Sequence, residues 1–319
     1  DQTRLARHAE KFGYDTIAVP EHHIIPRAHV DLSGPHYFHG YSAMAYFAGA
    51  TETIRLNSCI AILPLQNPIV SAKALSTMDF LSSGRVTVTF AVGWLKEEFD
   101  ILGVPFEKRG AMADEYIAAI IELWTKEEPE FEGEFVSFRD VAFEPKPMQR
   151  PHIPIWMGGD AEGPLRRLAR HGSGWWPFLT PPEKIPEGLD IIRSQPEFKG
   201  EPFEVMYGLS TSRVGEGHVP TDDDSGRPGM SAQEIIDRLN GFRELGVTMS
   251  SVAVPAVRSR EEFVDYCQWV MEEVRPAVTV DGVGFIINAG GNPGPFGKGI
   301  IFGHRHGAMV LHPVYGAVI

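Results

Sequence analysis

The sequence is poor in cysteine, in long apolar stretches and in positive charge. Two of its 319 residues are cysteines, Cys59 and Cys267, each in an apolar stretch, so we expect two buried free thiols rather than a disulfide. No stretch approaches the roughly 18 consecutive apolar residues of a membrane span, which excludes a membrane-spanning helix. Lys and Arg number 29 against 42 Asp and Glu, a net charge of −13. This balance argues against a general binder of nucleic acid or of anionic membranes.

Several common ligand-binding motifs are missing as well. There is no CxxC and no HExxH, so we expect no metal site. No GxGxxG follows a strand-like run and no GxxxxGK[ST] occurs, which leaves a Rossmann fingerprint and a P-loop without support. The opening residues, Asp1 to Glu10, are charged and helical, unlike a signal peptide. The expectation is a reduced, cytoplasmic protein.

The chain shows a strict alternation of apolar strand-like runs and helical segments. The strand-like runs are short and almost continuously apolar, as in a parallel sheet that helices cover. Strands are expected at 16–20, 54–63, 85–92, 153–157, 174–178, 205–210 and 250–255. Helices are expected at 1–12, 41–51, 68–81, 109–125, 161–171, 182–193, 231–245 and 260–274. The fold class is therefore α/β, a (β/α)8 TIM barrel whose first strand is apparently missing at the N-terminus.

The barrel domain is expected to span residues 1–277, with three longer connections. These lie at about 22–40, 127–151 and 214–229, and the last is polar and is interpreted as a mobile loop or lid.

An atypical Gly- and His-rich tail follows at residues 278–319. It contains one strand-like run, 283–288, which could fill the gap between the strands at 16–20 and 250–254, as in a circular permutation. The alternative, which the composition favours, is an extension that packs poorly on the barrel.

Polar and small residues stand where the expected strands end, which is the catalytic mouth of a β/α barrel. Glu21-His22-His23 follows the first strand, where a histidine can stabilise an anion or move a proton near neutral pH. The alternative is a loop pair satisfied by backbone carbonyls. Gly158-Gly159 stands between a strand and a helix, where it could cradle a phosphate or simply form a turn.

Other strand ends have both a local and a functional interpretation. Asn67 before Pro68 is a typical helix start, with Asn as the cap and Pro at the first position. This local role explains both residues without a role in function. Val92-Gly93 leaves room for a planar ring, or forms a tight turn. Trp175 and Trp176 point to opposite faces, so one is expected to pack on a helix while the other could line the mouth.

Together these stretches resemble the luciferase-like monooxygenase superfamily, and most closely its branch of oxidoreductases that depend on the deazaflavin coenzyme F420. The similarity covers about residues 1–276. The stretches that carry it, in the order and spacing of the family, are Ile60 to Pro68, Leu81 to Arg85, Val92 to Phe99, Pro154 to Gly159 and Gly174 to Pro177.

The resemblance implies a flavin-type ring bound at the C-terminal mouth of the barrel. A non-proline cis peptide behind the ring would be Ile60–Ala61, and the acidic residue and histidine near its reacting face would be Glu21 and His22. The remaining residues implied to touch the cofactor are Asn67, Val92 and Gly93 at the ring and ribityl chain, and Gly158, Gly159, Gly174 and Trp176 at or near the phosphate.

The activity implied is hydride transfer between F420 and a small organic substrate, with His22 as proton donor or polariser and Glu21 orienting it. The deazaflavin branch usually has Asp at the position of Glu21, and Glu-His-His also occurs in relatives that use flavin. An FMNH2-dependent monooxygenase using O2 is therefore one alternative, and a non-catalytic flavin-binding protein is another. The substrate cannot be read from the sequence, and analogy with the family suggests a homodimer.

Overall fold

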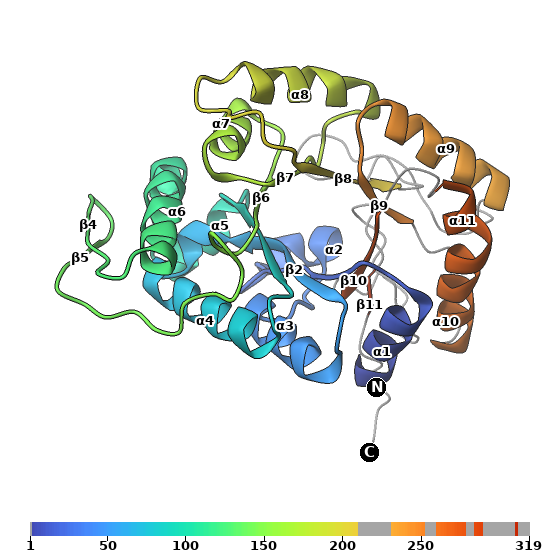
Figure 1. The fold of residues 1–319 in the computed structure, drawn as a ribbon, viewed down its shortest axis with the longest axis horizontal. Helices are drawn as coiled ribbons and strands as arrows, with labels where there is room; N and C mark the ends of the chain where they lie inside the picture. The colour runs from blue at the N-terminus through green and yellow to red at the C-terminus, as the bar shows by residue number, and fades with distance from the viewer. Residues whose placement is uncertain (1, 210–230, 253–259, 279–283, 290–309, 312–319) are drawn as a thin grey trace.

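A computed structural model describes residues 2–209, 231–252, 260–278, 284–289 and 310–311 (Figure 1). The expected lid at 214–229 lies outside these residues. In the described part of the chain, no helix combines the length and the apolarity needed to cross a membrane.

The core of the fold is a closed barrel of parallel strands wrapped by helices. Around the barrel the strands run β1 (Thr16–Val19), β2 (Arg55–Ile62), β3 (Val86–Ala91), β6 (Ile155–Gly158), β7 (Gly174–Trp176), β8 (Glu204–Leu209), β9 (Met249–Val252) and β10 (Gly284–Ala289). The hairpin strands β4 (Phe131–Glu132) and β5 (Ser137–Phe138) lie outside the barrel, and β11 (Val310–Leu311) pairs with β10. The expected TIM-barrel fold is confirmed.

Strand β10 closes the barrel. Its Ile286 pairs with Thr16 of β1, and its Gly284 pairs with Met249 of β9, both in parallel. This is the pairing that the circular-permutation interpretation predicts, so the strand belongs to the barrel although it lies in the Gly- and His-rich tail.

Helices form the outer layer of the barrel (Figure 1). The longer ones are α1 (Gln2–Phe12), α3 (Gly40–Ala50), α4 (Pro68–Leu81), α6 (Arg109–Thr125), α7 (Glu162–His171), α8 (Ile185–Ser194), α9 (Ala232–Glu244) and α10 (Arg260–Trp269). The shorter ones are α2 (Val30–Ser33), α5 (Lys96–Leu102) and α11 (Arg275–Val278), and a π-helical segment, Val270–Val274, joins α10 to α11.

Local chemistry explains where several helices begin. The Asn67 side chain accepts hydrogen bonds from the amides of Ile69 and Val70, and Pro68 follows at the first position of α4. Ser231 and Glu234 form a reciprocal capping box at the start of α9.

Alternate strand residues face either the helices or the barrel interior. Trp175 packs in the layer between strands and helices, whereas Trp176 joins an interior cluster. The residues of this cluster are Ala18, Trp156, Trp176, Met206 and Met249. The prediction that the two adjacent tryptophans face opposite sides is confirmed.

Two details of strand β2 correct the sequence analysis. The non-proline cis peptide bond is Cys59–Ile60, one residue before the expected Ile60–Ala61. Cys59 pairs with Thr89 and Ala61 with Phe90, so Ile60 is the extra residue of a β-bulge in this strand. Both cysteines are free, as expected, but Cys59 is half-buried rather than buried.

Candidate active site

The candidate site lies at the edge where the parallel strands end. Because the strands are parallel, Glu21 and His22 after β1, the bulge at Ile60 in β2, Gly93 after β3 and Gly158 at the end of β6 belong to one end of the barrel. The structure thus brings most of the expected site residues to the same mouth.

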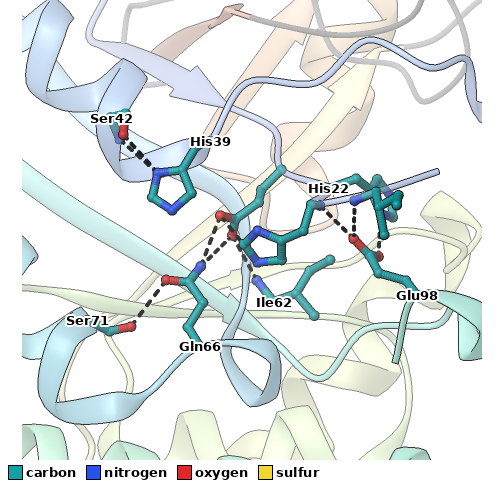
Figure 2. A network of polar contacts seen from close by, with 10 residues as sticks. His22, His39, Ser42, Ile62, Gln66, Ser71 and Glu98 are labelled. Atoms are coloured by element: carbon teal, nitrogen blue, oxygen red, sulfur yellow. Dashed lines mark hydrogen bonds and ion pairs between the residues drawn. The ribbon is translucent and has the colours of Figure 1, made fainter. Parts of the chain in front are cut away.

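His22 is held by a carboxylate from a distant part of the chain. Its Nδ1 lies 2.8 Å from Oε2 of Glu98, a residue of α5 whose side chain is only 1% exposed. The other carboxylate oxygen of Glu98 accepts hydrogen bonds from the amides of His23, at 2.6 Å, and Ile24, at 3.2 Å. Figure 2 shows His22 and Glu98 in this contact. We call His22 and Glu98 the His22–Glu98 pair.

The expectation that Glu21 orients His22 is therefore wrong. Successive residues of an extended segment point to opposite sides, so adjacency in sequence places the side chains of Glu21 and His22 in different networks. The signal that could have found Glu98 is the acidic pair Glu97-Glu98 after β3, of which Glu97 is exposed and Glu98 is buried.

The environment of Glu98 favours its charged form. Burial acts to raise the pKa of this carboxyl, but the hydrogen bond and charge of His22 and the two backbone amides outweigh it, so the pKa lies below its ordinary value. A charged Glu98 fixes His22 with Nδ1–H as the donor, and Nε2 is the ring nitrogen on the other side. The rings of Tyr37 and Trp94 stand edge-on to His22, with centroids 4.8 and 6.0 Å away.

Glu21 occupies a separate, buried position. Its carboxylate accepts hydrogen bonds from the amide of Ile62, at 3.2 Å, and from Nε2 of Gln66, which lies 2.9 Å from both oxygens. Gln66 is held in turn by Ser71, whose hydroxyl donates to its carbonyl oxygen at 3.2 Å (Figure 2). Burial raises the pKa of Glu21 to about 7, against the lowering effect of these hydrogen bonds.

The bulge of β2 and the ends of β3 and β6 form an apolar floor. A Cβ built on Gly158 would lie 2.9 Å from Cγ2 of Ile60 and 3.4 Å from Cβ of Ala91. At Gly93, φ is +80° and a Cβ would lie 2.7 Å from Cγ2 of Ile62, so this position requires glycine. A pocket opens beside the floor, lined by Phe90, Ala91, Val92, Ala113, Ile117, Met157, Gly158, Pro164 and Arg167.

The expected phosphate cradle consists of the turn at Gly158-Gly159 and the N-terminus of α7. The amide in this turn that could face a phosphate, that of Gly159, is already hydrogen-bonded. The amide of Gly159 donates to the carbonyl of Trp176 at 3.0 Å, and the carbonyl of Gly159 accepts from Trp175 Nε1 at 2.9 Å. Within the described part of the chain, no side chain caps α7, which begins at Glu162. Arg167 reaches the pocket while its guanidinium contacts Asp114 at 2.6 Å. An anion here would therefore rely on the first amides of α7 and on Arg167.

Three residues that were expected to bind the cofactor make contacts within the protein that stabilise the fold. Asn67 is exposed and caps α4. A Cβ on Gly174 would lie 2.3 Å from Cδ1 of Trp156, so its missing side chain makes room for that indole. Trp176 packs with Trp156 at a centroid distance of 6.2 Å. Their contact with a cofactor stays a prediction.

Comparison with known proteins identifies a family and several relatives. A family model described as luciferase-like monooxygenase matches residues 1–216. A protein of Mycobacterium tuberculosis (strain ATCC 25618 / H37Rv), named as uncharacterized, is 32% identical over 276 residues and is aligned over 82% of this chain and 90% of its own. The FMNH(2)-dependent dimethylsulfone monooxygenase of Pseudomonas putida is 37% identical over 161 residues, which cover 49% of this chain and 44% of that one.

A solved structure shares the fold. The coenzyme F420-dependent tetrahydromethanopterin reductase of Methanopyrus kandleri superposes with a TM-score of 0.66 at 16% identity, covering 86% of this chain and 94% of that one.

Proposed function

Since this chain belongs to the luciferase-like monooxygenase family, we propose that it is an oxidoreductase that transfers a hydride between coenzyme F420 and a small organic substrate. The observation that carries the proposal is the His22–Glu98 pair at the barrel mouth, with its Nδ1 to Oε2 distance of 2.8 Å. A histidine held in this way can give or take the proton that must accompany hydride transfer to or from oxygen.

The residues at the mouth fit such a cofactor. Ile60, Ala91 and Gly158 offer an apolar floor on which one face of a planar ring could rest, beside Val92 and Gly93. The first amides of α7 and the guanidinium of Arg167 offer positive charge to a phosphate. When bound, the deazaflavin supplies or accepts the hydride.

The protein's own part in the reaction is orientation and proton movement. Glu98 holds the His22 ring by Nδ1 and leaves Nε2 to exchange a proton with the substrate oxygen. Because Glu98 is buried and ionised, it stabilises the imidazolium form of His22 whenever Nε2 takes up that proton.

Anaerobic titration with oxidised F420, reduced F420 and FMN, followed by fluorescence, tests the proposal. We expect micromolar or tighter binding of F420. His22→Ala should lower turnover by about 10²-fold or more while cofactor affinity changes little. His29→Ala is the matched control, because His29 lies in the same loop and faces Glu97 at 3.6 Å. Equal turnover in His22→Ala and the unaltered protein would remove His22 from the mechanism.

An FMNH2-dependent monooxygenase is the second candidate. It is favoured by the 37% identity to the dimethylsulfone monooxygenase, whose name specifies FMNH2. Oxygen consumption in the presence of FMNH2, together with tighter binding of FMN than of F420, would favour this candidate.

A cofactor that binds but is never turned over would instead indicate a flavin-binding protein. A homodimer also remains part of the proposal, as does a barrel domain over residues 1–277 to which the tail at 278–319 contributes strand β10.

A further inference from the structure

Three side chains that can ligate a metal converge beside the His22–Glu98 pair. Glu21, His23 and His39 each offer one ligand atom, and these atoms all lie within 4.8 Å of one another. Glu21 and His23 follow β1, whereas His39 stands just before α3. A parallel backbone bridge between Glu21 and Phe38 holds the two segments side by side.

The ring of His23 has a buried nitrogen without a hydrogen bond to any described residue. This atom is Nε2, and Oε1 of Glu21 lies 3.8 Å from it. That separation is too long for a hydrogen bond but close to the roughly 3.3–3.5 Å between two ligands of a tetrahedral Zn²⁺ ion with bonds of about 2.0–2.1 Å.

Outer contacts hold the other two ligands in place. Gln66 and the Ile62 amide fix the Glu21 carboxylate, as described above. Nδ1 of His39 lies 2.9 Å from the hydroxyl oxygen of Ser42 and 3.3 Å from its amide nitrogen (Figure 2). An ion bound at Nε2 of His39 requires the tautomer in which Nδ1 carries the hydrogen and donates it to the Ser42 hydroxyl. A histidine ligand whose other ring nitrogen is held by an oxygen is the usual arrangement at protein metal sites.

We propose that Glu21, His23 and His39 bind a divalent transition-metal ion, of which Zn²⁺ is the representative probe. Two imidazoles and one carboxylate form the donor set that such an ion prefers, and three protein ligands leave one coordination position open. Because His39 is exposed, that position is accessible to water or to an oxygen of a small molecule. This metal site is independent of the proposed redox function, since it does not need F420 or FMN.

Calorimetric titration of the chelator-treated full chain with Zn²⁺ tests the proposal. We expect one equivalent to bind with micromolar or tighter affinity, and His39→Asn to weaken binding by at least about tenfold. Asparagine keeps a side chain able to cap α3, as His39 does through the Ser42 amide, so the helix start is preserved. His23→Asn should weaken binding to a similar extent, and circular dichroism establishes that each variant is folded.

Two controls separate this cluster from the other histidines. His29→Asn should bind Zn²⁺ as the unaltered protein does. A triple variant, His304→Gln with His306→Gln and His312→Gln, should also keep the binding. Unchanged affinity in both His39→Asn and His23→Asn, or loss of binding only in the triple variant, would overturn the proposal. Cobalt absorption spectroscopy gives a second readout that does not depend on activity.

Discussion

Replacing Glu98 by glutamine separates the charge of this side chain from its shape. In the present structure one carboxylate oxygen faces Nδ1 of His22 and the other accepts from the amides of His23 and Ile24. The carbonyl of a glutamine can keep both amide bonds, but its NH2 group then faces Nδ1 of His22. His22 must give up the hydrogen on Nδ1, accept a hydrogen bond there and carry its proton on Nε2.

The substitution should damage turnover more than stability. No carboxylate then balances an imidazolium at His22, and we expect turnover to fall by about 10²-fold or more. One charge-assisted hydrogen bond, worth about 1.5–3 kcal/mol, is replaced by a neutral one worth about 1 kcal/mol, so the free energy of unfolding should fall by about 0.5–2 kcal/mol. Glu98→Ala leaves both amides without their acceptor, and its cost should reach about 3–5 kcal/mol.

Urea unfolding measures the stability change, and nitrogen NMR of the histidine rings measures the tautomer of His22. Glu97→Gln is the matched control, because Glu97 precedes Glu98 on the same helix but is exposed. Its unfolding free energy should stay within about 0.5 kcal/mol of the unaltered value. If Glu98→Gln keeps both full turnover and a hydrogen on Nδ1 of His22, the proposed role of the His22–Glu98 pair is refuted.

Two further predictions concern the barrel itself. Gly93→Ala forces φ of +80° on a residue with a Cβ and places that atom 2.7 Å from Cγ2 of Ile62. Urea unfolding should therefore show that the free energy of unfolding falls by about 2–3 kcal/mol. Gly103→Ala is the control and should cause a smaller loss, because a Cβ there has no described atom within 4 Å. Ending the chain at Val278 removes β10 and exposes the edges of β1 and β9, so size-exclusion chromatography should show further association or unfolding. An unchanged elution profile with the same unfolding midpoint would contradict a closing role for β10.

Two helices have the bounds that the sequence predicts. The expected spans 68–81 and 109–125 coincide with α4 and α6, the first because Asn67 and Pro68 specify its start through contacts within four residues. The helix Lys96–Leu102 was not predicted, because seven residues are too few for a clear helical period.

The eighth strand shows what composition cannot decide. Residues 284–289 are strand-like in isolation, but their place between β1 and β9 depends on pairing with residues that are distant in the sequence. A Gly- and His-rich neighbourhood favoured the interpretation of a poorly packed extension, and only the count of seven strands in a barrel that needs eight argued for another strand. Long-range pairing of this kind is governed by the closure of the whole barrel, which no local window contains.

The candidate site was likewise predictable where it depends on neighbours in the sequence, and not where it depends on distant residues. Glu21-His22-His23 stood out because it follows a strand, yet the partner of His22 lies 76 residues away in α5. These three adjacent residues serve two networks: the amide of His23 binds Glu98, while its ring faces Glu21. A substitution at His23 can therefore disturb both the His22–Glu98 pair and the proposed metal site. Zn²⁺ affinity and the His22 tautomer must be measured on the same variants, because only their separate responses distinguish the two networks.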